Sequence, residues 1–377
     1  MKKVFIVSAK RTPIGKFGGS LASFSPGELG AKVIGEIIAE TGIDASKIDS
    51  VIAGSVLNAG QSQGVARQAA IKAGIPAEVP AYGVNMVCGS GMKAVMNAYA
   101  EILSGAASVI IAGGTESMSN AGWILPSSVR NGVKMGNIAL TDHMVFDGLT
   151  DAFSNVHMGI TAENIAEKYS LTREEQDEFS YKSQVKAIAA VDNGSFDEEN
   201  IKIEIVTKKE TIVFHKDEYP NRASTPEKLA ALKPAFKKDG TVTAGNASGV
   251  NDGASFVMLA DEEAVKRFNL KPLVEIISCG QGGVDPSIMG MGPVPAIRMA
   301  LKNSGLSLKE MEIIELNEAF AAQSLGVIKE LCNEHGVDKD FFEERCNLNG
   351  GAIALGHPIG ASGNRIIVTL IHLLKNK

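Results

Sequence analysis

An internal repeat sets the strongest limit on how this chain can fold. The segment Gly42–Ala53 (GIDASKIDSVIA) has a counterpart in Gly305–Leu316 (GLSLKEMEIIEL), with glycine first and an apolar run last. Two shorter matches follow in the same order, QSQGV at 61–65 with QSLGV at 323–327, and SGMKAV at 90–95 with SGNRII at 362–367. Three matches in order indicate two copies of one unit, which we expect to pack about a pseudo-two-fold axis.

Within the first copy, short apolar runs alternate with stretches of helical periodicity. The runs at 4–8, 49–53 and 108–112 are typical of buried strands, whereas 26–41, 64–73 and 88–103 place apolar residues on one helical face. This alternation predicts an α/β fold with largely parallel sheets. We expect a first core half at 1–118, completed by about 250–270, and a second at 271–377. The looser segment 119–249, with one charged helix at 172–191, is predicted to be an inserted loop domain.

Charge and cysteine content exclude several classes of function. The net charge is −6 and the sequence has no block of Lys and Arg, so neither a nucleic-acid partner nor an anionic membrane is expected. No apolar stretch reaches the ~18 residues of a membrane span. The four cysteines show no CxxC spacing, which argues against a zinc site and against a disulfide framework. Free thiols favour a cytoplasmic protein, and no metal is expected.

Cys88 lies between an apolar run and a Gly-Ser-Gly turn that precedes a predicted helix (VNMVCGSGMK). The unpaired N–H groups and positive dipole end of that helix would lower the pKa of the thiol and favour thiolate. A buried core cysteine at a tight turn is the competing interpretation. Gly89 and Gly91 weaken it, because they leave room for a substrate beside the sulfur.

Two further motifs lie at corresponding ends of the second copy. His357 sits in a loop stiffened by Gly and Pro (ALGHPIGASG), and the repeat places it opposite Cys88, as an activated thiolate requires. Asn317 and Glu318 follow a predicted strand at 313–316, where they could fix a water or a carbonyl. Taken alone, the histidine could satisfy a carbonyl, and the asparagine could cap a helix.

Together these motifs resemble the thiolase family, in particular its biosynthetic acetyl-CoA C-acetyltransferase type. The resemblance covers nearly the whole chain and rests on NMVCGSGMKAV, NVHMGITAENIAEKY, VTAGNASGVNDGA, ELNEAFAAQ and NGGAIALGHPIGASG. It implies two duplicated βαβαβ-type halves in a layered αβαβα core, with a loop domain for CoA binding and oligomerisation. The implied activity is the reversible Claisen condensation of two acetyl-CoA to acetoacetyl-CoA, or the thiolytic reverse.

The resemblance also assigns roles to individual residues. Cys88 would carry the acyl group, His357 would deprotonate it and help an oxyanion hole, Asn317 would orient a water, and Glu318 would hold the Asn loop. Residues implied in substrate binding are His157, Met158 and Met289 at the acyl pocket, Ser248 and Leu149 along the pantetheine, Arg222 at a CoA phosphate, and Ala319 and Phe320 beside the Asn motif. No cofactor is implied, since coenzyme A is part of the substrate, and a homotetramer is expected through 123–136.

One departure from the family pattern concerns the second half of the reaction. Thiolases use a second cysteine, in a Cys-x-Gly-Gly-Gly segment beyond the histidine, to take the α-proton of the second acyl group. This sequence has no cysteine after His357. Two interpretations stand: a truncated form of a normal thiolase, which we favour, or a genuine variant that folds with an altered end. As the sequence is written, we expect little condensation, with acyl transfer onto Cys88 surviving in part.

Three alternatives differ in substrate or in activity. A 3-ketoacyl-CoA thiolase for longer chains shares the Cys, Asn and His motifs, but the pair His157 and Met158 argues for a short acyl chain. A ketosynthase shares the doubled fold but would carry a different catalytic set. A non-catalytic, thiolase-like CoA-binding protein would bind CoA without turnover.

Overall fold

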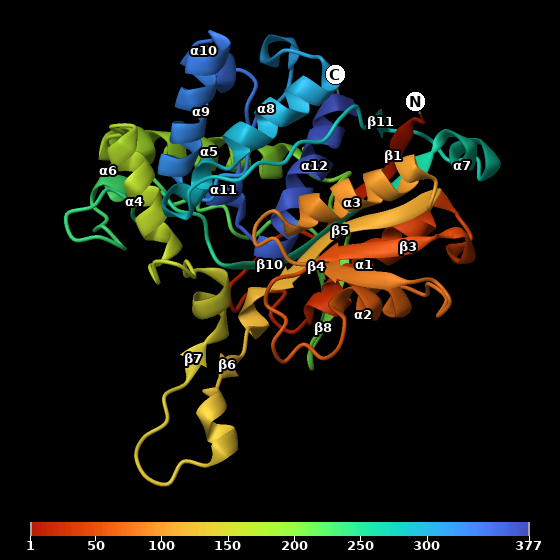
Figure 1. The fold of residues 1–377 in the computed structure, drawn as a ribbon, viewed down its shortest axis with the longest axis horizontal. Coiled ribbons are helices and arrows are strands. Elements are labelled where there is room, and N and C mark those ends of the chain that lie inside the picture. The colour runs from red at the N-terminus through yellow and green to blue at the C-terminus, as the bar shows by residue number, and fades with distance from the viewer. Residues whose placement is uncertain (1, 376–377) are drawn as a thin grey trace.

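A mixed β-sheet forms the centre of the fold in a computed structural model that describes residues 2–375 (Figure 1). Its seven strands run in the order β11-β1-β10-β5-β3-β4, with β2 paired to β10. The strands are β1 (Val4–Arg11), β2 (Gly15–Lys16), β3 (Ser50–Gly54), β4 (Ala81–Val84), β5 (Val109–Ser117), β10 (Asn251–Asp261) and β11 (Val274–Glu275). β3 is parallel to β4 and β5, whereas β10 is antiparallel to β1 and β5.

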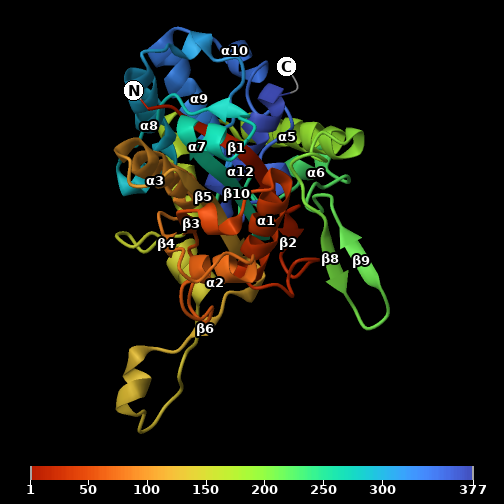
Figure 2. The ribbon, with the colours of Figure 1, turned by 90° about the vertical axis from the view of Figure 1, so that its right-hand side faces the viewer.

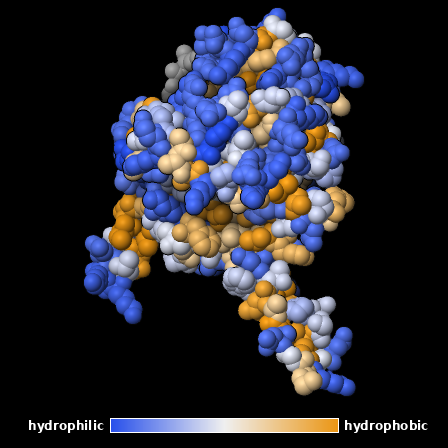
Figure 3. All heavy atoms as spheres, turned by 90° about the vertical axis from the view of Figure 1, so that its left-hand side faces the viewer, coloured by the Kyte–Doolittle hydropathy of each residue, from blue (hydrophilic) through white to orange (hydrophobic). Residues whose placement is uncertain are grey.

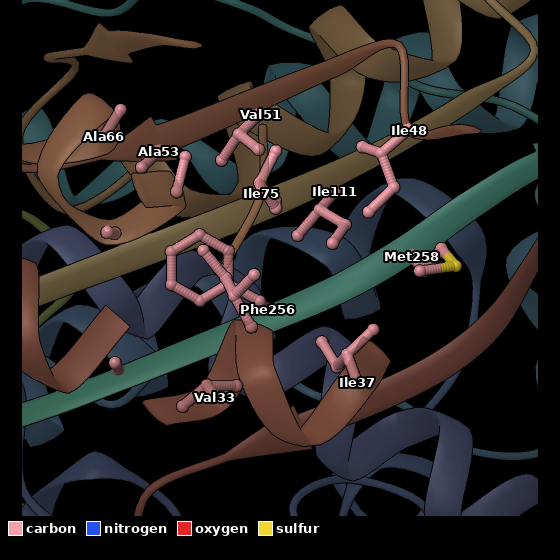
Figure 4. Close-up of a cluster of buried hydrophobic side chains, with 14 of the residues drawn as sticks. Val33, Ile37, Ile48, Val51, Ala53, Ala66, Ile75, Ile111, Phe256 and Met258 are labelled. Atoms are coloured by element: carbon pink, nitrogen blue, oxygen red, sulfur yellow. The ribbon is translucent and has the colours of Figure 1, made fainter. Parts of the chain in front are cut away.

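Helices cover both faces of this sheet, which confirms the predicted α/β class. The expectation of a largely parallel sheet is wrong, because β1 and β10 pair antiparallel with all their neighbours. One face packs on α1 (Pro26–Thr41) and α2 (Val65–Lys72), and the other on α3 (Ser90–Ser104) and α12 (Ile359–Lys375). Figure 4 shows the first of these layers, where Val33 and Ile37 of α1 lie in one buried cluster with Phe256 and Met258 of β10. The apolar spacing in the sequence therefore buries the helices against the sheet.

The start of α1 shows how local sequence fixes an element. Ser25 caps the helix by accepting the Glu28 N–H, and the Glu28 carboxylate accepts the Ser25 N–H in return. Pro26 occupies the first turn, and Gly42 ends the helix with a φ of 64°. Capping boxes and left-handed glycines satisfy the orphan groups at helix ends, so the expected span 26–41 is the observed one.

The middle segment carries two arms that leave the body of the molecule (Figure 2). One is a tongue that runs out along β6 and back along β7, and the other is the hairpin of β8 and β9. Its elements are β6 (Trp123–Ile124), η3 (Ser127–Asn131), β7 (Thr141–Asp142), η4 (Met144–Gly148), α4 (Met158–Lys168), α5 (Arg173–Asn193), β8 (Ile203–Val206), β9 (Thr211–Phe214) and α6 (Pro226–Ala230).

A fully buried arginine ties this middle segment to the sheet. Arg11 at the end of β1 donates to both carboxylate oxygens of Asp217, at 2.7 and 2.9 Å, and to Glu199 at 2.6 Å. Thr369 of α12 also donates to Glu199, at 3.2 Å. A buried charge that lost one partner would be strongly destabilising, so this cluster fixes the segment relative to β1 and α12.

The C-terminal part is mostly helical. It comprises α7 (Glu262–Arg267), η5 (Pro286–Met291), α8 (Pro293–Ser304), η6 (Leu308–Glu310), α9 (Ala321–His335), α10 (Lys339–Glu343) and α11 (Ala352–Leu355), followed by α12. A second apolar cluster, which includes Val294, Val327 and Leu331, holds α8 and α9 together. Within residues 2–375, none of the helices combines the length and the apolar content needed to cross a bilayer.

The repeat recurs in the helices but not in the strands. Gly42 and Gly305 both end a helix with left-handed φ values of 64° and 73°, and α3 and α12 occupy matching positions. The predicted strand at 313–316 is wrong. Ile314 forms one isolated bridge to Cys346, and the Asn347 side chain pairs with both the N–H and the C=O of Leu316. The Asn347 side chain thus makes the hydrogen bonds to Leu316 that a neighbouring strand would make, and strand pairing ends there.

Candidate active site

Cys88 is held at the tip of a strained turn just before α3. Val87 has a φ of 47°, which is an outlier for a β-branched residue. The Ser90 hydroxyl supports this conformation, since it donates to the Val87 carbonyl at 2.6 Å and accepts the Met86 N–H at 2.8 Å. The turn leaves Cys88 half-buried at the N-terminal end of the helix.

His357 faces this sulfur from the start of α12. Its Nε2 lies 3.2 Å from the Cys88 Sγ, and its Nδ1 lies 2.6 Å from the Ser362 Oγ. Because the Ser362 hydroxyl donates to the Pro358 carbonyl at 2.9 Å, its oxygen is left to accept a proton from Nδ1. This network assigns the ring proton to Nδ1 and leaves Nε2 free to accept the thiol proton.

Glycines bring the two helix starts together. A β-carbon on Gly91 of α3 would lie 2.9 Å from the Asn364 nitrogen and 3.0 Å from the Gly360 oxygen of α12. On Gly363 it would lie 2.8 Å from the Met92 nitrogen. Side chains at these positions would push the helices apart, so the close approach of Cys88 and His357 depends on small residues at the crossing.

The electrostatics of the pair differ from the expectation at Cys88. Burial raises the pKa of the Cys88 thiol to about 11, and the Glu116 charge adds to this, although the thiol's own backbone N–H acts in the opposite direction. Burial, with the Arg365 charge, lowers the pKa of His357 to about 4. The expected lowering of the thiol pKa by the helix dipole is therefore wrong, because desolvation outweighs it. The resting pair is a neutral thiol beside a neutral imidazole.

Asn317 and Glu318 differ sharply in how they are bonded. The Glu318 carboxylate is buried and accepts the Ser183 hydroxyl at 2.6 Å and the Asn347 amide at 2.8 Å, and burial raises its pKa. A β-carbon on Gly351 would collide with it. Among residues 2–375, the buried Asn317 Oδ1 has no hydrogen-bond partner. Glu318 therefore fixes the surrounding loops, whereas the Asn317 oxygen is shielded from solvent and has no partner among the described residues.

Most of the residues predicted to bind substrate lie together along the middle segment. The His157 ring stacks on Phe236 with centroids 4.6 Å apart, and Phe236 meets Phe320 edge-on at 6.2 Å. Met158, Met289 and Ala319 pack against the same apolar cluster. Backbone hydrogen bonds connect Leu149 and Ser248 to this group. The Met158 N–H donates to the Leu149 carbonyl at 2.8 Å, and the Ser248 N–H donates to the Ala319 carbonyl at 2.9 Å.

Arg222 stands apart from this group in the structure. Its guanidinium is exposed and makes two hydrogen bonds to Asp192, at 2.9 and 2.5 Å. Its phosphate-binding role stays a prediction.

Three residues near the reactive pair were not identified from the sequence. Ser362 bonds the imidazole, the Asn251 Oδ1 accepts the His357 N–H at 2.9 Å, and Glu116 acts electrostatically on the thiol. The sequence did contain a signal for Glu116. This carboxylate directly follows the apolar run SVIIAGGT, and a carboxylate buried with such a run is costly unless it has partners. Among residues 2–375, no group of three or more His, Cys, Asp or Glu is arranged to hold a metal ion.

Both halves of the chain match models of one protein family. The thiolase N-terminal domain model matches residues 4–263, and the thiolase C-terminal domain model matches 270–377. An acetyl-CoA acetyltransferase of Pseudomonas aeruginosa is 54% identical over 373 residues, covering 99% of this chain and 93% of the relative. A probable acetyl-CoA acyltransferase of Staphylococcus aureus is 51% identical over 378 residues, covering 100% and 94%.

Solved structures also resemble the chain over its whole length. The Bacillus anthracis acetyl-CoA acetyltransferase superposes with a TM-score of 0.94 at 44% identity, covering 100% of this chain and 93% of that one. The human mitochondrial 3-ketoacyl-CoA thiolase superposes with a TM-score of 0.93, also at 44% identity and with the same coverage.

Proposed function

The chain belongs to the thiolase family, and on that premise we propose that it transfers an acetyl group from acetyl-CoA to Cys88, as the first half of a reversible condensation to acetoacetyl-CoA. The observation that carries this proposal is the 3.2 Å contact between the Cys88 Sγ and the unprotonated Nε2 of His357. A thiol within reach of a neutral base is the arrangement that nucleophilic acyl transfer requires.

The first half-reaction follows from this contact. As the Cys88 sulfur attacks the thioester carbonyl, its proton passes to His357 Nε2, and the Ser362 oxygen holds the opposite ring N–H. The tetrahedral intermediate then expels the CoA sulfur, which takes the proton from the imidazolium. The products are acetyl-Cys88 and CoA, with one proton moved and no oxidant or cofactor consumed.

The second half-reaction joins a second acetyl-CoA to the acetyl-Cys88 carbonyl. It needs a base for the α-proton and donors for each developing oxyanion. Asn317 is proposed to orient a water toward such an oxyanion, because its buried Oδ1 has no partner within residues 2–375. Of the other thiols in the described chain, Cys332 donates to the Asp338 carbonyl, Cys346 is buried beside Glu318, and Cys279 is half-buried.

An acetyl-sized acyl group is proposed because three aromatic rings pack together where the family resemblance places the acyl group. His157, Phe236 and Phe320 form a continuous contact, and burial lowers the pKa of His157, which keeps its ring neutral beside an apolar acyl chain. The competing candidate is a 3-ketoacyl-CoA thiolase for longer chains, which the likeness to the human enzyme favours. Cleavage of acetoacetyl-CoA compared with a ten-carbon 3-ketoacyl-CoA distinguishes the two.

CoA recognition and assembly complete the proposal. Arg222 is proposed to exchange its Asp192 partner for a CoA phosphate, since both side chains are exposed and arginine binds phosphate through two parallel hydrogen bonds. A homotetramer is proposed because the tongue exposes large apolar side chains (Figure 3), including Trp123 and Met135.

The direct test is to weigh the protein after incubation with acetyl-CoA. We expect one acetyl group per chain, located by peptide mapping on Cys88, and none in Cys88→Ala. Cys332→Ala, which removes another partly accessible thiol, should be acetylated like the parent chain. Acetylation elsewhere, or none at all in the parent protein, would overturn the proposal.

A further inference from the structure

Glu116 is a buried carboxylate that the acyl-transfer steps above do not use. It lies near the carboxyl end of β5, and its side chain is fully shielded from solvent. Carboxylates are almost never buried without compensation. Glu116 is bonded to Gly360 of α12 and its charge reaches the Cys88 thiol, so a role at the reactive pair is worth testing.

Three backbone N–H groups compensate the buried charge. Val56 and Leu57, in the loop after β3, donate to Glu116 at 3.0 and 3.1 Å. Gly360, in the first turn of α12, donates at 2.9 Å. The carboxylate therefore joins a loop of the first copy to the helix of the second copy that follows His357, at the end where the helix dipole is positive.

The atoms around Glu116 and Gly360 are packed too closely to admit an added β-carbon. A β-carbon on Gly360 would lie 2.6 Å from the Glu116 Oε2, and one on Gly114 of β5 would collide with the Gly360 carbonyl. The start of α12 is thus pressed onto β5 while Glu116 holds its N–H. Because His357 is three residues earlier in the chain, this junction determines where the imidazole stands relative to Cys88.

Glu116 also acts on the pair through its charge. Its negative charge is one of the causes that raise the pKa of the Cys88 thiol. Burial raises the pKa of Glu116 itself to about 7, and the Asp252 charge on β10 adds to this. Over the alkaline range in which the thiol titrates, Glu116 is therefore ionised and opposes formation of the thiolate.

We propose that Glu116 is a positioning residue of the acyl-transfer site: by holding the Gly360 N–H it fixes the His357 imidazole opposite Cys88, and its negative charge acts on the thiol. The inference rests on the proposed acetyl transfer for its kinetic consequence only. The effect of the charge on the thiol needs no substrate.

Two variants separate the positioning of His357 from the effect of the Glu116 charge on the thiol. Glu116→Gln removes the charge, so the pH midpoint for alkylation of Cys88 by iodoacetamide should shift downward. Glu116→Asp keeps the charge but is one methylene shorter and cannot reach all three N–H groups, so that midpoint should stay near the parent value. Both should acetylate more slowly, by about 10²-fold if the imidazole moves by ~1 Å. Alkylation is followed on the Cys88 peptide by mass spectrometry.

A matched control carries a similar carboxylate elsewhere. Glu163 is buried on α4 and accepts the N–H groups of Thr241 and Val242. Glu163→Gln should change neither the Cys88 alkylation midpoint nor the acetylation rate of the folded protein, with folding checked by circular dichroism.

An unchanged alkylation midpoint in folded Glu116→Gln, or an unchanged acetylation rate in Glu116→Asp, would overturn the inference. A merely structural role would lower the melting temperature without moving the midpoint. If the parent chain took no acetyl group, the proposed function would fail, and the alkylation profiles would still decide the effect of Glu116 on the thiol.

Discussion

At the scale of single residues, the reactivity of Cys88 depends on a competition between desolvation and local donors. The glycine-flanked turn and the helix start would favour thiolate, yet burial raises the pKa of the thiol to about 11. The same burial lowers the pKa of His357 to about 4. Environments that move two pKa values apart in this way make one group the proton donor and the other the acceptor.

This competition predicts how acetylation depends on pH. His357 is neutral above about pH 4, so the parent chain should acetylate at a nearly constant rate between about pH 6 and pH 10. In His357→Ala the thiolate must form unaided, so the rate should rise about tenfold per pH unit toward the thiol pKa of about 11. The rate of adduct formation on Cys88, measured by mass, checks both profiles.

His215→Ala is the control for this experiment, because that histidine is exposed on the loop after β9. It should keep the flat profile. A flat profile in His357→Ala would mean that another group takes the thiol proton.

The sequence predicted the members of the site better than its electrostatics. Cys88, His357, Asn317 and Glu318 stand out through their motifs, and the repeat correctly placed the first two opposite each other. Burial could not be obtained in the same way, because the surroundings of the thiol come from distant segments such as β5. Arg222 was assigned from its motif alone, and its ion pair with Asp192 is visible only in the structure.

At the scale of elements, apolar periodicity predicted the helices of the first half, whereas the strands depended on pairing with other segments. The span 26–41 carries its own start and stop signals and is observed unchanged. The run at 313–316 has the composition of a strand, but a strand also needs backbone partners. Here the Asn347 side chain occupies that place, which no local pattern could indicate.

The crossing of α3 and α12 yields a prediction at this scale. Gly91→Ala places a β-carbon 2.9 Å from the backbone nitrogen of Asn364, so the helices must separate. We expect a loss of about 1–3 kcal/mol in the free energy of unfolding, measured with urea, and slower acetylation because Cys88 moves away from His357.

Gly35→Ala is the matched control. Gly35 lies within α1, and a β-carbon there would meet nothing within 4 Å. Alanine should raise the free energy of unfolding by about 0.5–1 kcal/mol and leave acetylation unchanged. Equal effects of the two substitutions would show that the helix crossing is not under steric constraint.

At the scale of the whole molecule, the two arms differ in how they expose apolar surface. The hairpin of β8 and β9 exposes three large apolar side chains, whereas the tongue exposes six. The hairpin has Val206, Ile212 and Val213, the tongue has Trp123, Leu125, Val133, Met135, Ile138 and Leu140, and Met135 is 94% exposed. A two-stranded hairpin is marginal in water, so an apolar arm of this kind is expected to be covered by other copies of the chain.

The last prediction concerns that assembly. The double substitution Met135→Lys and Leu140→Lys should convert the proposed tetramer into smaller species in sedimentation velocity experiments, because lysine ammonium groups resist burial in an apolar interface. Val206→Lys introduces the same charge on the other arm, at a side chain that is 79% exposed, and should leave the tetramer intact. Since the tongue lies outside the Cys88–His357 contact, acetylation of Cys88 should persist in the dissociated variant. Dissociation by Val206→Lys instead would assign the interface to the β8–β9 hairpin, and a tetramer that survives the double substitution would remove the tongue from the assembly.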